Sequence, residues 1–310
     1  MRLIFNKTAL FYAEYNVRLL LFLLFSKADI YLSNDTDTLV SNYLASAIRK
    51  KALVFDAHEM FPEVPELTQK PFSKSIWTKI EDWIFPRLKH CYTVCESIAD
   101  NYNRRYGISM QVVRNIPFSE PGIHVDKKEL ASNGKRVLLY QGAVNVGRGV
   151  EWMIEAMPYL DDCIFYIAGD GDVMPEIRAK VKDLNLENRV VLLGKIPLEE
   201  LPSYTRSADI GISLLANMGL NYYYSLPNRI FDFMRAGVPV LATDFPEIRR
   251  MIDRYGIGQL TGNHEPRYLA STIQEMLAQE KNTAGFEQAN AELSWENESL
   301  VLLNIINGTA

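Results

Sequence analysis

Short apolar runs recur along the 310-residue chain, and stretches with helical spacing separate most of them. Runs of β-branched and aromatic residues that end near Gly, Asn or Asp are typical of buried parallel strands. The runs with this pattern are Ala28–Ser33, Ala52–Phe55, Val137–Tyr140, Cys163–Ala168, Val190–Leu193, Ile210–Leu214 and Val238–Ala242. Their alternation with helical patterns predicts an α/β protein with doubly wound parallel sheets.

Stretches with helical spacing follow the later runs, and several begin with acidic residues or proline. They cover Gly149–Met157, Met174–Leu184, Leu198–Ser207 and Asn228–Ala236. The segment Pro117–Gly134 is rich in Pro, Gly and charge and has no strong period, as expected of a domain boundary. We therefore expect two Rossmann-like domains over residues 1–118 and 134–293, a linker over residues 119–133, and a C-terminal helix over residues 294–310.

The composition is that of an ordinary globular protein, with 48% hydrophobic and 23% charged residues. The net charge of −5 provides no global basic field, so we expect no nucleic-acid partner. Residues 1–118 hold 15 Lys and Arg against 12 Asp and Glu, a net of +3, and the remaining residues have a net of −8. This asymmetry fits a first half that faces an anionic surface or acceptor, and ordinary surface scatter explains it equally well.

The three cysteines, Cys91, Cys95 and Cys163, are too few and too awkwardly spaced for a disulfide framework or a zinc site. We expect buried free thiols and hence a reducing, cytoplasmic location, and we find no secretory signal. The apolar run Val17–Phe25 is too short to span a bilayer and contains Arg18. It predicts a core helix, with interfacial membrane contact as the alternative.

The segment Tyr222–Thr243, YYYSLPNRIFDFMRAGVPVLAT, carries the most informative pattern. Ser225 is a favourable N-cap and Pro227 suits a first turn, which predicts that a helix begins here. A helix amino terminus offers free N–H groups and the positive end of a dipole, and both suit a phosphate. Asp232 follows on the same side, where its carboxylate can accept hydrogen bonds from a ribose diol. The alternative is a plain capped helix with a surface aspartate.

A glycine-containing loop follows the run Val137–Tyr140 in VLLYQGAVNVGRGV. Gly142 allows the backbone to approach a pyrophosphate, and Arg148 can clamp that group with paired N–H donors. Ordinary turn glycines explain this pattern when it is taken alone. Its place after a strand and before a helix favours phosphate binding.

Together these segments resemble the nucleotide-binding signature of the family 4 glycosyltransferases, which have the GT-B fold. In that family two acidic residues flank the turn before the helix; Asp232 occupies the second position here and Tyr224 the first, which leaves the sugar contact open. The family often has a second basic residue after the loop glycine, where this chain has Ala143, so Arg148 is expected to act alone.

The resemblance extends over nearly the whole second half of the chain. Phe165–Asp172 resembles a strand that ends in Ala-Gly-x-Gly, and Val190–Pro197 resembles the strand and loop that bracket the nucleobase. The implied donor-binding residues are Gly142, Arg148, Lys195, Ile196, Tyr224, Ser225, Leu226, Pro227 and Asp232.

In the first half, the loop Val54–Glu63 places Asp56, His58 and Glu59 after a predicted strand. A lone histidine is more often structural. The resemblance, however, implies that His58 contacts the donor sugar, stabilises the leaving group or orients the acceptor, with Asp56 and Glu59 on the acceptor side. By the same resemblance Asn115 is a hinge or cleft residue.

Asp35 and Asp37, in YLSNDTDT, form an Asp-x-Asp after a predicted strand, which is how GT-A glycosyltransferases hold a divalent cation. The second half instead resembles a GT-B donor domain, in which a helix dipole and Arg148 replace the metal. We therefore expect no metal and no cofactor. Asn34 and Asp35 are expected to line the acceptor cleft or to cap the next helix.

Three further segments bear on partners and completeness. Lys70–Lys89 mixes basic residues with apolar ones at helical spacing, which predicts a helix packed on its own core, with contact to an anionic membrane as the alternative. Ser294–Gly308 resembles the family's final helix, which crosses back onto the first domain and which Trp295 would anchor. Residues 1–16 lack the glycine loop with which the family's first domain begins, so we expect an incomplete N-terminal domain, naturally reduced or truncated, with exposed edge strands.

The resemblance implies retaining, metal-independent transfer of a sugar from a nucleotide sugar, UDP- or GDP-linked, to a glycan or lipid-linked acceptor. Cell-surface polysaccharide or lipopolysaccharide assembly is the expected setting, in the cytoplasm with peripheral contact to the membrane. His58 and Arg148 are the expected catalytic residues, acting mainly through electrostatics. Two alternatives stay open: a non-catalytic or partner-dependent nucleotide-sugar-binding subunit, and a GT-B sugar-nucleotide epimerase.

Overall fold

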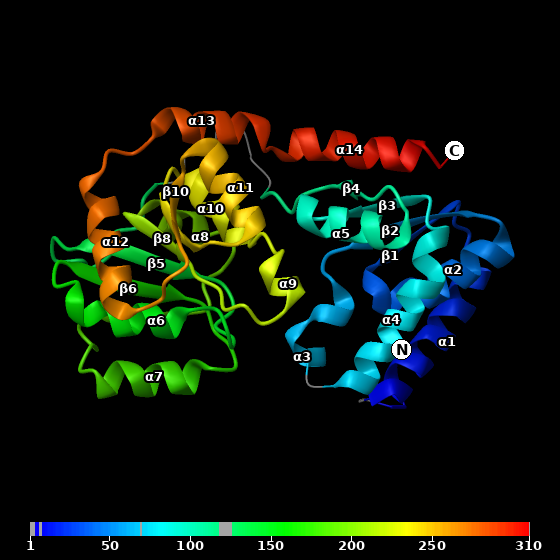
Figure 1. The fold of residues 1–310 in the computed structure, drawn as a ribbon, viewed down its shortest axis with the longest axis horizontal. Helices are drawn as coiled ribbons and strands as arrows, with labels where there is room; N and C mark the ends of the chain where they lie inside the picture. The colour runs from blue at the N-terminus through cyan, green and yellow to red at the C-terminus, as the bar shows by residue number, and fades with distance from the viewer. Residues whose placement is uncertain (1–3, 6–7, 69, 118–125, 310) are drawn as a thin grey trace. The chain divides into compact units, whose positions relative to one another are not determined.

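The protein forms two compact units, each built around one parallel sheet (Figure 1). The structure is a computed structural model that describes residues 4–5, 8–68, 70–117 and 126–309. The first unit takes its residues from Met1–Asn115, Met218–Ser225 and Glu296–Ala310, and the second from Ile116–Asn217 and Leu226–Trp295. The predicted class, two α/β domains with parallel sheets, is confirmed.

In the first unit the strand order is β1-β2-β3-β4, and all neighbours pair in parallel. The strands are β1 (Ile30–Asn34), β2 (Ala52–Ala57), β3 (His90–Thr93) and β4 (Gln111–Val112). The helices are α1 (Thr8–Phe25), α2 (Asp35–Arg49), η1 (Phe61–Glu63), α3 (Pro65–Thr68), α4 (Pro71–Ile84), η2 (Phe85–Arg87), α5 (Glu96–Tyr106), α9 (Leu220–Tyr223) and α14 (Trp295–Asn307). Because parallel strands end at the same edge, this sheet gathers the loops after β1 and β2 side by side.

Two predicted helices of the first unit differ in how they are packed. The segment Lys70–Lys89 contains α4, whose Trp77 and Ile84 are buried, so the prediction of a helix on its own core is confirmed. The run Val17–Phe25 lies in α1, but the prediction of a core helix is wrong. Because α1 packs mainly on α2 among the described elements, Val17 and Phe25 on its other side remain exposed.

In the second unit the strand order is β10-β9-β8-β5-β6-β7, again with parallel neighbours. The strands are β5 (Arg136–Gln141), β6 (Cys163–Ala168), β7 (Val190–Gly194), β8 (Ile210–Ser213), β9 (Val240–Thr243) and β10 (Gly258–Thr261). The helices are α6 (Val150–Ala156), η3 (Met157–Tyr159), α7 (Met174–Asp183), α8 (Leu201–Arg206), α10 (Asn228–Ala236), α11 (Pro246–Tyr255), α12 (Pro266–Ala278) and α13 (Thr283–Glu292).

The helices of the second unit cover both faces of its sheet. α6, α7 and α12 pack together on one face, and α8, α10, α11 and α13 lie on the other (Figure 1). A hydrophobic core fills the space under the first group and includes Leu138, Phe165 and Ile212 from the sheet with Met153 and Ile273 from the helices. This two-sided covering explains why these strands read as continuous apolar runs in the sequence.

Each predicted strand is present, but β3, β4 and β10 were not among the predictions. β4 contains two residues, and β10 has the sequence GQLT, so neither has the apolar run on which the prediction depended. The predicted linker, residues 119–133, falls partly on residues 118–125, which lie outside the described residues.

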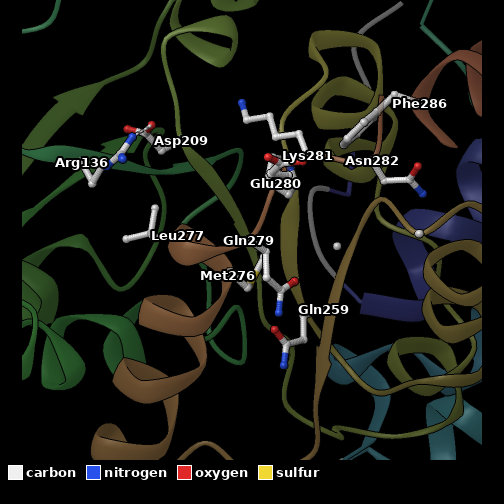
Figure 2. A pocket seen from close by; sticks show the side chains of 13 residues that line it. Arg136, Asp209, Gln259, Met276, Leu277, Gln279, Glu280, Lys281, Asn282 and Phe286 are labelled. Carbon is white, nitrogen blue, oxygen red and sulfur yellow. Dashed lines mark hydrogen bonds and ion pairs between the residues drawn. The ribbon is translucent and has the colours of Figure 1, made fainter. Parts of the chain in front are cut away.

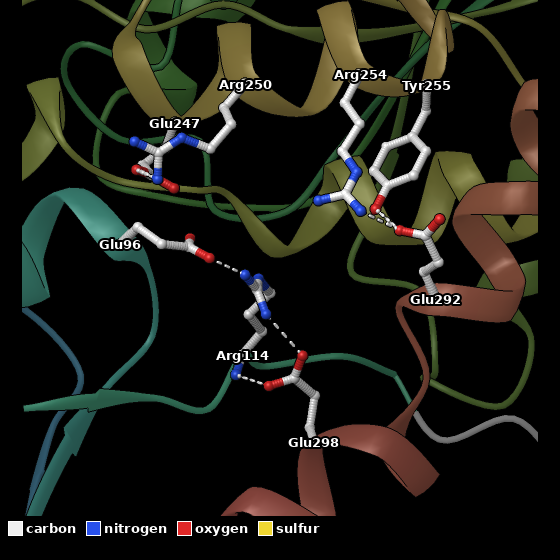
Figure 3. Close-up of polar contacts among 8 residues, drawn as sticks. All are labelled: Glu96, Arg114, Glu247, Arg250, Arg254, Tyr255, Glu292 and Glu298. Carbon is white, nitrogen blue, oxygen red and sulfur yellow. Dashed lines mark hydrogen bonds and ion pairs between the residues drawn. The ribbon is translucent and has the colours of Figure 1, made fainter.

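The C-terminal helix α14 is tied to the first unit by one arginine (Figure 3). The backbone N–H and Nη1 of Arg114 donate to the two carboxylate oxygens of Glu298, each at 2.8 Å, and Nη2 contacts Glu96. Glu298 is buried, so this charge-assisted pairing fixes the start of α14 more firmly than a surface ion pair would. Trp295 is the first residue of the helix.

Candidate active site

His58 lies just beyond β2, at the carboxyl end of the first sheet. Its Nε2 is 3.0 Å from Asp56 Oδ2, and its backbone N–H donates to Asp35 Oδ1 at 2.9 Å. Asn34 pairs in register with Asp56 across the two strands, which places Asp35 at the start of α2 beside the β2 loop. The structure therefore brings together four residues that the sequence pointed to: Asn34, Asp35, Asp56 and His58.

Both ring nitrogens of His58 face a polar partner. Asp56 Oδ2 also accepts a hydrogen bond from the hydroxyl of Tyr92 at 3.0 Å, and the side-chain nitrogen of Asn115 lies 3.4 Å from His58 Nδ1. The hydrogen bond to Asp56 raises the pKa of His58 above its usual value, with burial acting in the opposite direction. The imidazolium therefore persists to a higher pH than that of a free histidine.

Glu59 is held by a residue far away in the sequence. Asn221, in the short helix α9, accepts a hydrogen bond from the backbone N–H of Met60 at 3.0 Å and donates one to Glu59 Oε2 at 3.2 Å. Burial raises the pKa of Glu59, and the charge of Asp35 adds to this effect. Burial also raises the pKa of Asp35. These residues form what we call the His58 cluster: Asp35, Asp56, His58 and Glu59.

In the second unit, the loop after β5 begins with a glycine, so no side chain covers its backbone there. Gly142 has a φ of +120°, and its N–H donates to the carbonyl of Ala168 at the end of β6. A Cβ on Gly169 would lie only 1.8 Å from the carbonyl oxygen of Gly142, so any side chain there would force the two loops apart. Backbone alone therefore forms the wall at the carboxyl ends of these strands, where open α/β sheets bind ligands.

Arg148 and Asp232 lie in the same unit as this loop. Asp232, on α10, accepts a hydrogen bond from Gln141 Nε2 at 2.8 Å, and burial raises its pKa. Burial lowers the pKa of Arg229 in the first turn of α10, and the charge of Arg148 lowers it further. Gly142 thus lies beside Arg229 at the start of α10, and Asp232 is bonded to Gln141, the residue before Gly142.

Ser225 does not cap α10 as predicted. The helix begins at Asn228 with Pro227 as its N-cap, because Pro227 is extended, with a φ of −63° and a ψ of 131°. The hydroxyl of Ser225 donates instead to the carbonyl of Tyr222, in the turn that closes α9. Within the described residues, no side chain makes a capping hydrogen bond at the start of α10.

The remaining predicted donor residues are spread over both units. Lys195 and Ile196 follow Gly194 at the end of β7, with Lys195 exposed. Tyr224 closes α9 in the first unit, and its carbonyl accepts a hydrogen bond from the thiol of Cys95. Leu226 is buried in the second unit.

Sequence reasoning missed Tyr92, Asn221 and Arg229. Tyr92 and Asn221 carry no local signal, because their importance comes from contacts across 36 and 161 positions of sequence. The sequence did carry a local signal for Arg229. An arginine in the first turn of a helix opposes the helix dipole, and Arg229 is also buried, so a cation is placed where only an anion would compensate it.

A cavity of about 300 Å³ lies at the opposite edge of the second sheet (Figure 2). Its lining includes Arg136, Asp209, Gln259, Lys281 and Asn282, near the amino ends of the strands. Arg136 is already paired with Asp209 at 3.1 Å. Since ligands of open α/β sheets bind at the carboxyl ends, this cavity is not the candidate active site.

Two properties of the described residues concern the predicted partners. Within residues 4–5, 8–68, 70–117 and 126–309, no three His, Cys, Asp or Glu side chains are grouped so that they could hold a metal ion. Over the same ranges, no helix has the length and apolar character needed to cross a membrane. Cys91, Cys95 and Cys163 are free and buried, as predicted.

Sequence profiles of known families match both halves of the chain. The profile described as Glycosyltransferase Family 4 matches residues 2–117, and the profile described as Glycosyl transferases group 1 matches residues 135–279. The two matches follow the order in which the sequence resemblance placed an acceptor-side half and a donor-binding half.

Individual proteins resemble the chain more distantly. The alpha-monoglucosyldiacylglycerol synthase of Streptococcus pneumoniae is 26% identical over 195 residues, which cover 58% of this chain and 42% of that protein. The amylovoran biosynthesis glycosyltransferase AmsK of Erwinia amylovora is 27% identical over 130 residues, which cover 41% of this chain and 32% of that protein. The chain thus spans less than half the length of these curated relatives.

Among solved structures, HepE of Anabaena in complex with UDP-glucose has the same fold. It superposes with a TM-score of 0.75 at 16% identity, over 95% of this chain and 82% of that one. The GT-B architecture expected from the sequence is therefore confirmed.

Proposed function

The chain belongs to the family 4 glycosyltransferases, and from this premise we propose that it moves a sugar from a nucleotide-sugar donor to a glycan or lipid-linked acceptor. We further propose that the configuration at the anomeric carbon is retained and that the transfer requires no metal ion or cofactor. The family resemblance supports retention, and the charge distribution of the second unit supports independence of a metal.

One observation carries the proposal of a nucleotide-sugar donor. At the carboxyl ends of β5 and β6, the backbone loop at Gly142, the guanidinium of Arg148 and the start of α10 belong to one arrangement. Free N–H groups, a helix dipole and a guanidinium all favour a diphosphate. The half-buried carboxylate of Asp232 then suits the ribose hydroxyls, because it can accept hydrogen bonds from both.

The proposed chemistry is mainly electrostatic. When the bond from the anomeric carbon to the diphosphate breaks, negative charge builds on the diphosphate oxygen, and Arg148 with the N–H groups of α10 stabilises it. On the family resemblance alone, we assign the His58 imidazolium to the reacting sugar as a further positive charge. The acceptor hydroxyl then attacks from the same face and its proton passes to the departing diphosphate oxygen, which retains the configuration without a covalent intermediate on the protein.

The acceptor class is proposed from the names of the relatives. One of them acts in the biosynthesis of amylovoran, and another is named for a glucosylated diacylglycerol. Both names fit an acceptor that is a growing glycan or a lipid-linked glycan in cell-surface polysaccharide or lipopolysaccharide assembly. The structure with UDP-glucose supports a UDP-linked donor, with a GDP-linked donor as the other candidate.

A peripheral position at the inner face of the membrane completes the proposal. α1 exposes Leu10, Val17, Leu21, Phe22 and Phe25, which could rest on the headgroup region of a bilayer. The free thiols of the chain are compatible with the reducing cytoplasm. Sedimentation with phosphatidylglycerol vesicles but not with phosphatidylcholine vesicles would support this position, and equal recovery in both supernatants would exclude it.

The decisive experiment is a donor screen of the purified protein in the presence of EDTA. UDP-, GDP-, ADP- and dTDP-sugars are tested for a thermal shift and for slow hydrolysis. A donor that stabilises the protein and is hydrolysed without metal supports the proposed transferase. Binding without turnover would instead indicate a partner-dependent binding subunit, conversion of the donor sugar without release would indicate an epimerase, and no binding would refute the donor site.

Replacing Arg148 tests the phosphate assignment directly. In Arg148→Ala the diphosphate loses a charged bidentate contact, so turnover of the donor found in the screen should fall about a hundredfold. Arg178→Ala, an exposed arginine on α7, serves as the matched control and should leave turnover unchanged. Unchanged turnover in Arg148→Ala would show that the phosphate site is wrongly placed.

A further inference from the structure

Arg229 is buried at the start of α10, and part of its hydrogen-bonding capacity is unused there. The residue is 8% exposed, and its Nη1 has no hydrogen-bond partner among the described residues. Its guanidinium carbon lies 4.3 Å from the centroid of the Tyr140 ring, at a distance suited to a cation–π contact. This contact orients the guanidinium plane but leaves a buried N–H group without an acceptor, which is costly unless a ligand supplies one.

Arg229 has both a cation and a carboxylate near it. Burial is the main cause that lowers the pKa of Arg229, the neighbouring guanidinium of Arg148 lowers it further, and Asp232, three residues later on α10, acts in the opposite direction. The amino end of the helix adds a positive partial charge beside Arg229. The arginine cluster, by which we mean Arg148, Arg229 and Asp232, therefore keeps a buried guanidinium where an anionic ligand would favour its charge.

The geometry also shows where an anion would enter. A Cβ built on Gly142 would lie 3.6 Å from Arg229 Nη2, and Gly142 itself is exposed. The guanidinium thus lies directly behind a position without a side chain, at the mouth of the loop after β5. Any larger residue at position 142 would cover it.

We propose that Arg229 is a second diphosphate-binding cation, which reaches the donor phosphates from α10 past Gly142 and works together with Arg148. This inference rests on the proposed nucleotide-sugar donor and deepens it, because it assigns a contact that the loop after β5 does not supply: Ala143 follows Gly142 where a basic side chain could have stood. Two guanidiniums neutralise a diphosphate more completely than one, as a bound divalent cation would otherwise do.

The test compares ligands that differ only in phosphate. Binding of inorganic pyrophosphate, UDP and uridine, and of GDP and guanosine, is measured by calorimetry for the wild type, Arg229→Gln, Arg229→Lys and the control Arg178→Gln. In Arg229→Gln we expect the affinity for pyrophosphate and for the diphosphate of the bound nucleoside to fall at least about tenfold, or 1.4 kcal/mol. The nucleoside itself should bind within about twofold of the wild type, and Arg229→Lys should recover part of the loss.

A structural role for Arg229 predicts something different. If the residue only supports Tyr140, its loss should weaken diphosphate and nucleoside binding equally and lower the melting temperature, and Arg229→Lys should not restore phosphate affinity selectively. Either this result or unchanged pyrophosphate affinity overturns the inference. If Arg229→Gln does not fold, Arg229→Lys alone decides, because a point charge should lose severalfold in diphosphate affinity but nothing in nucleoside affinity. Wild-type protein that binds pyrophosphate but no nucleotide would refute the proposed donor while leaving the anion site intact.

Discussion

The His58 cluster of the first unit and the arginine cluster of the second are built from opposite charges. The His58 cluster combines one imidazole with three carboxyl groups. The arginine cluster combines two guanidiniums with one carboxyl group. In the first, His58 and Glu59 are held by side-chain hydrogen bonds from their neighbours. Each cluster also contains a buried polar atom without a hydrogen-bond partner among the described residues, an acceptor in the first (Asp56 Oδ1) and a donor in the second (Arg229 Nη1).

This difference indicates different tasks. A cluster of coupled titratable groups can hold a proton at a chosen atom, because each neighbour shifts the protonation of the others. A pair of neighbouring guanidiniums instead suits a ligand with several negative charges. The His58 cluster therefore suits proton and sugar chemistry, whereas the arginine cluster suits binding of the leaving diphosphate.

Replacing His58 should give the largest effect, a loss of turnover without a matching loss of UDP affinity. In His58→Ala we expect turnover of the confirmed donor to fall by about 10² or more, with UDP affinity within about twofold of the wild type. His90→Ala, at the amino end of β3, is the matched control and should leave turnover unchanged. Comparable losses of turnover and UDP affinity in His58→Ala would show that the two clusters do not have separate tasks.

The next largest effect should come from Asp56→Asn, through protonation of His58. Asp56 is the main cause of the raised pKa of His58, so the protonated ring is present up to a higher pH in the wild type than in the variant. The alkaline limb of the pH–kcat profile should therefore move to lower pH in Asp56→Asn. The acidic limb should move less, because burial, the largest cause of the raised pKa values of Asp35 and Glu59, is unchanged in the variant.

Tyr92→Phe refines this measurement. It removes the hydroxyl that donates to Asp56 Oδ2 but leaves the contact between Asp56 and His58. The alkaline limb should move less than in Asp56→Asn. An unmoved alkaline limb in Asp56→Asn would mean that the charge on His58 is not needed for the reaction.

The sequence predicted the second sheet well because helices cover both of its faces. Strands such as Cys163–Ala168 are buried at every position, which produces the continuous apolar runs from which they were predicted. The exposed side of α1 could not be predicted in this way. An apolar helix has the same sequence pattern whether its second side is covered or not, and Val17 and Phe25 are exposed.

The candidate site was predictable where its residues are local. His58 and Asp56 are separated by one residue, and Arg148 follows Gly142 within a single loop. Asn221 was not predictable, because it contacts Glu59 only after residues 218–225 join the first unit. The predicted helical stretch Asn228–Ala236 matches α10, but the cap was misplaced by two residues, since Pro227 and not Ser225 is the N-cap.

The smallest expected effect concerns Glu81, a buried carboxyl next to the His58 cluster. Glu81, on α4, accepts hydrogen bonds from Thr36, which follows Asp35, and from the hydroxyls of Tyr102 and Tyr106. Burial raises its pKa to about 8. At neutral pH the Glu81 carboxyl is therefore mostly protonated. It then adds no negative charge beside the His58 cluster.

The pH dependence of stability tests this assignment. Because the pKa of Glu81 is raised on folding, its contribution to stability is fully present below the unfolded value near 4.5 and is lost as pH rises through about 8. The free energy of unfolding in urea should thus fall by a few kcal/mol between pH 5.5 and 8.5 in the wild type and by less in Glu81→Gln, which is neutral throughout. Glu275→Gln, on the exposed side of α12, should keep the wild-type slope. Parallel curves for the wild type and Glu81→Gln would show that Glu81 is ionised in the fold, and the His58 cluster would then lie beside a fourth negative charge.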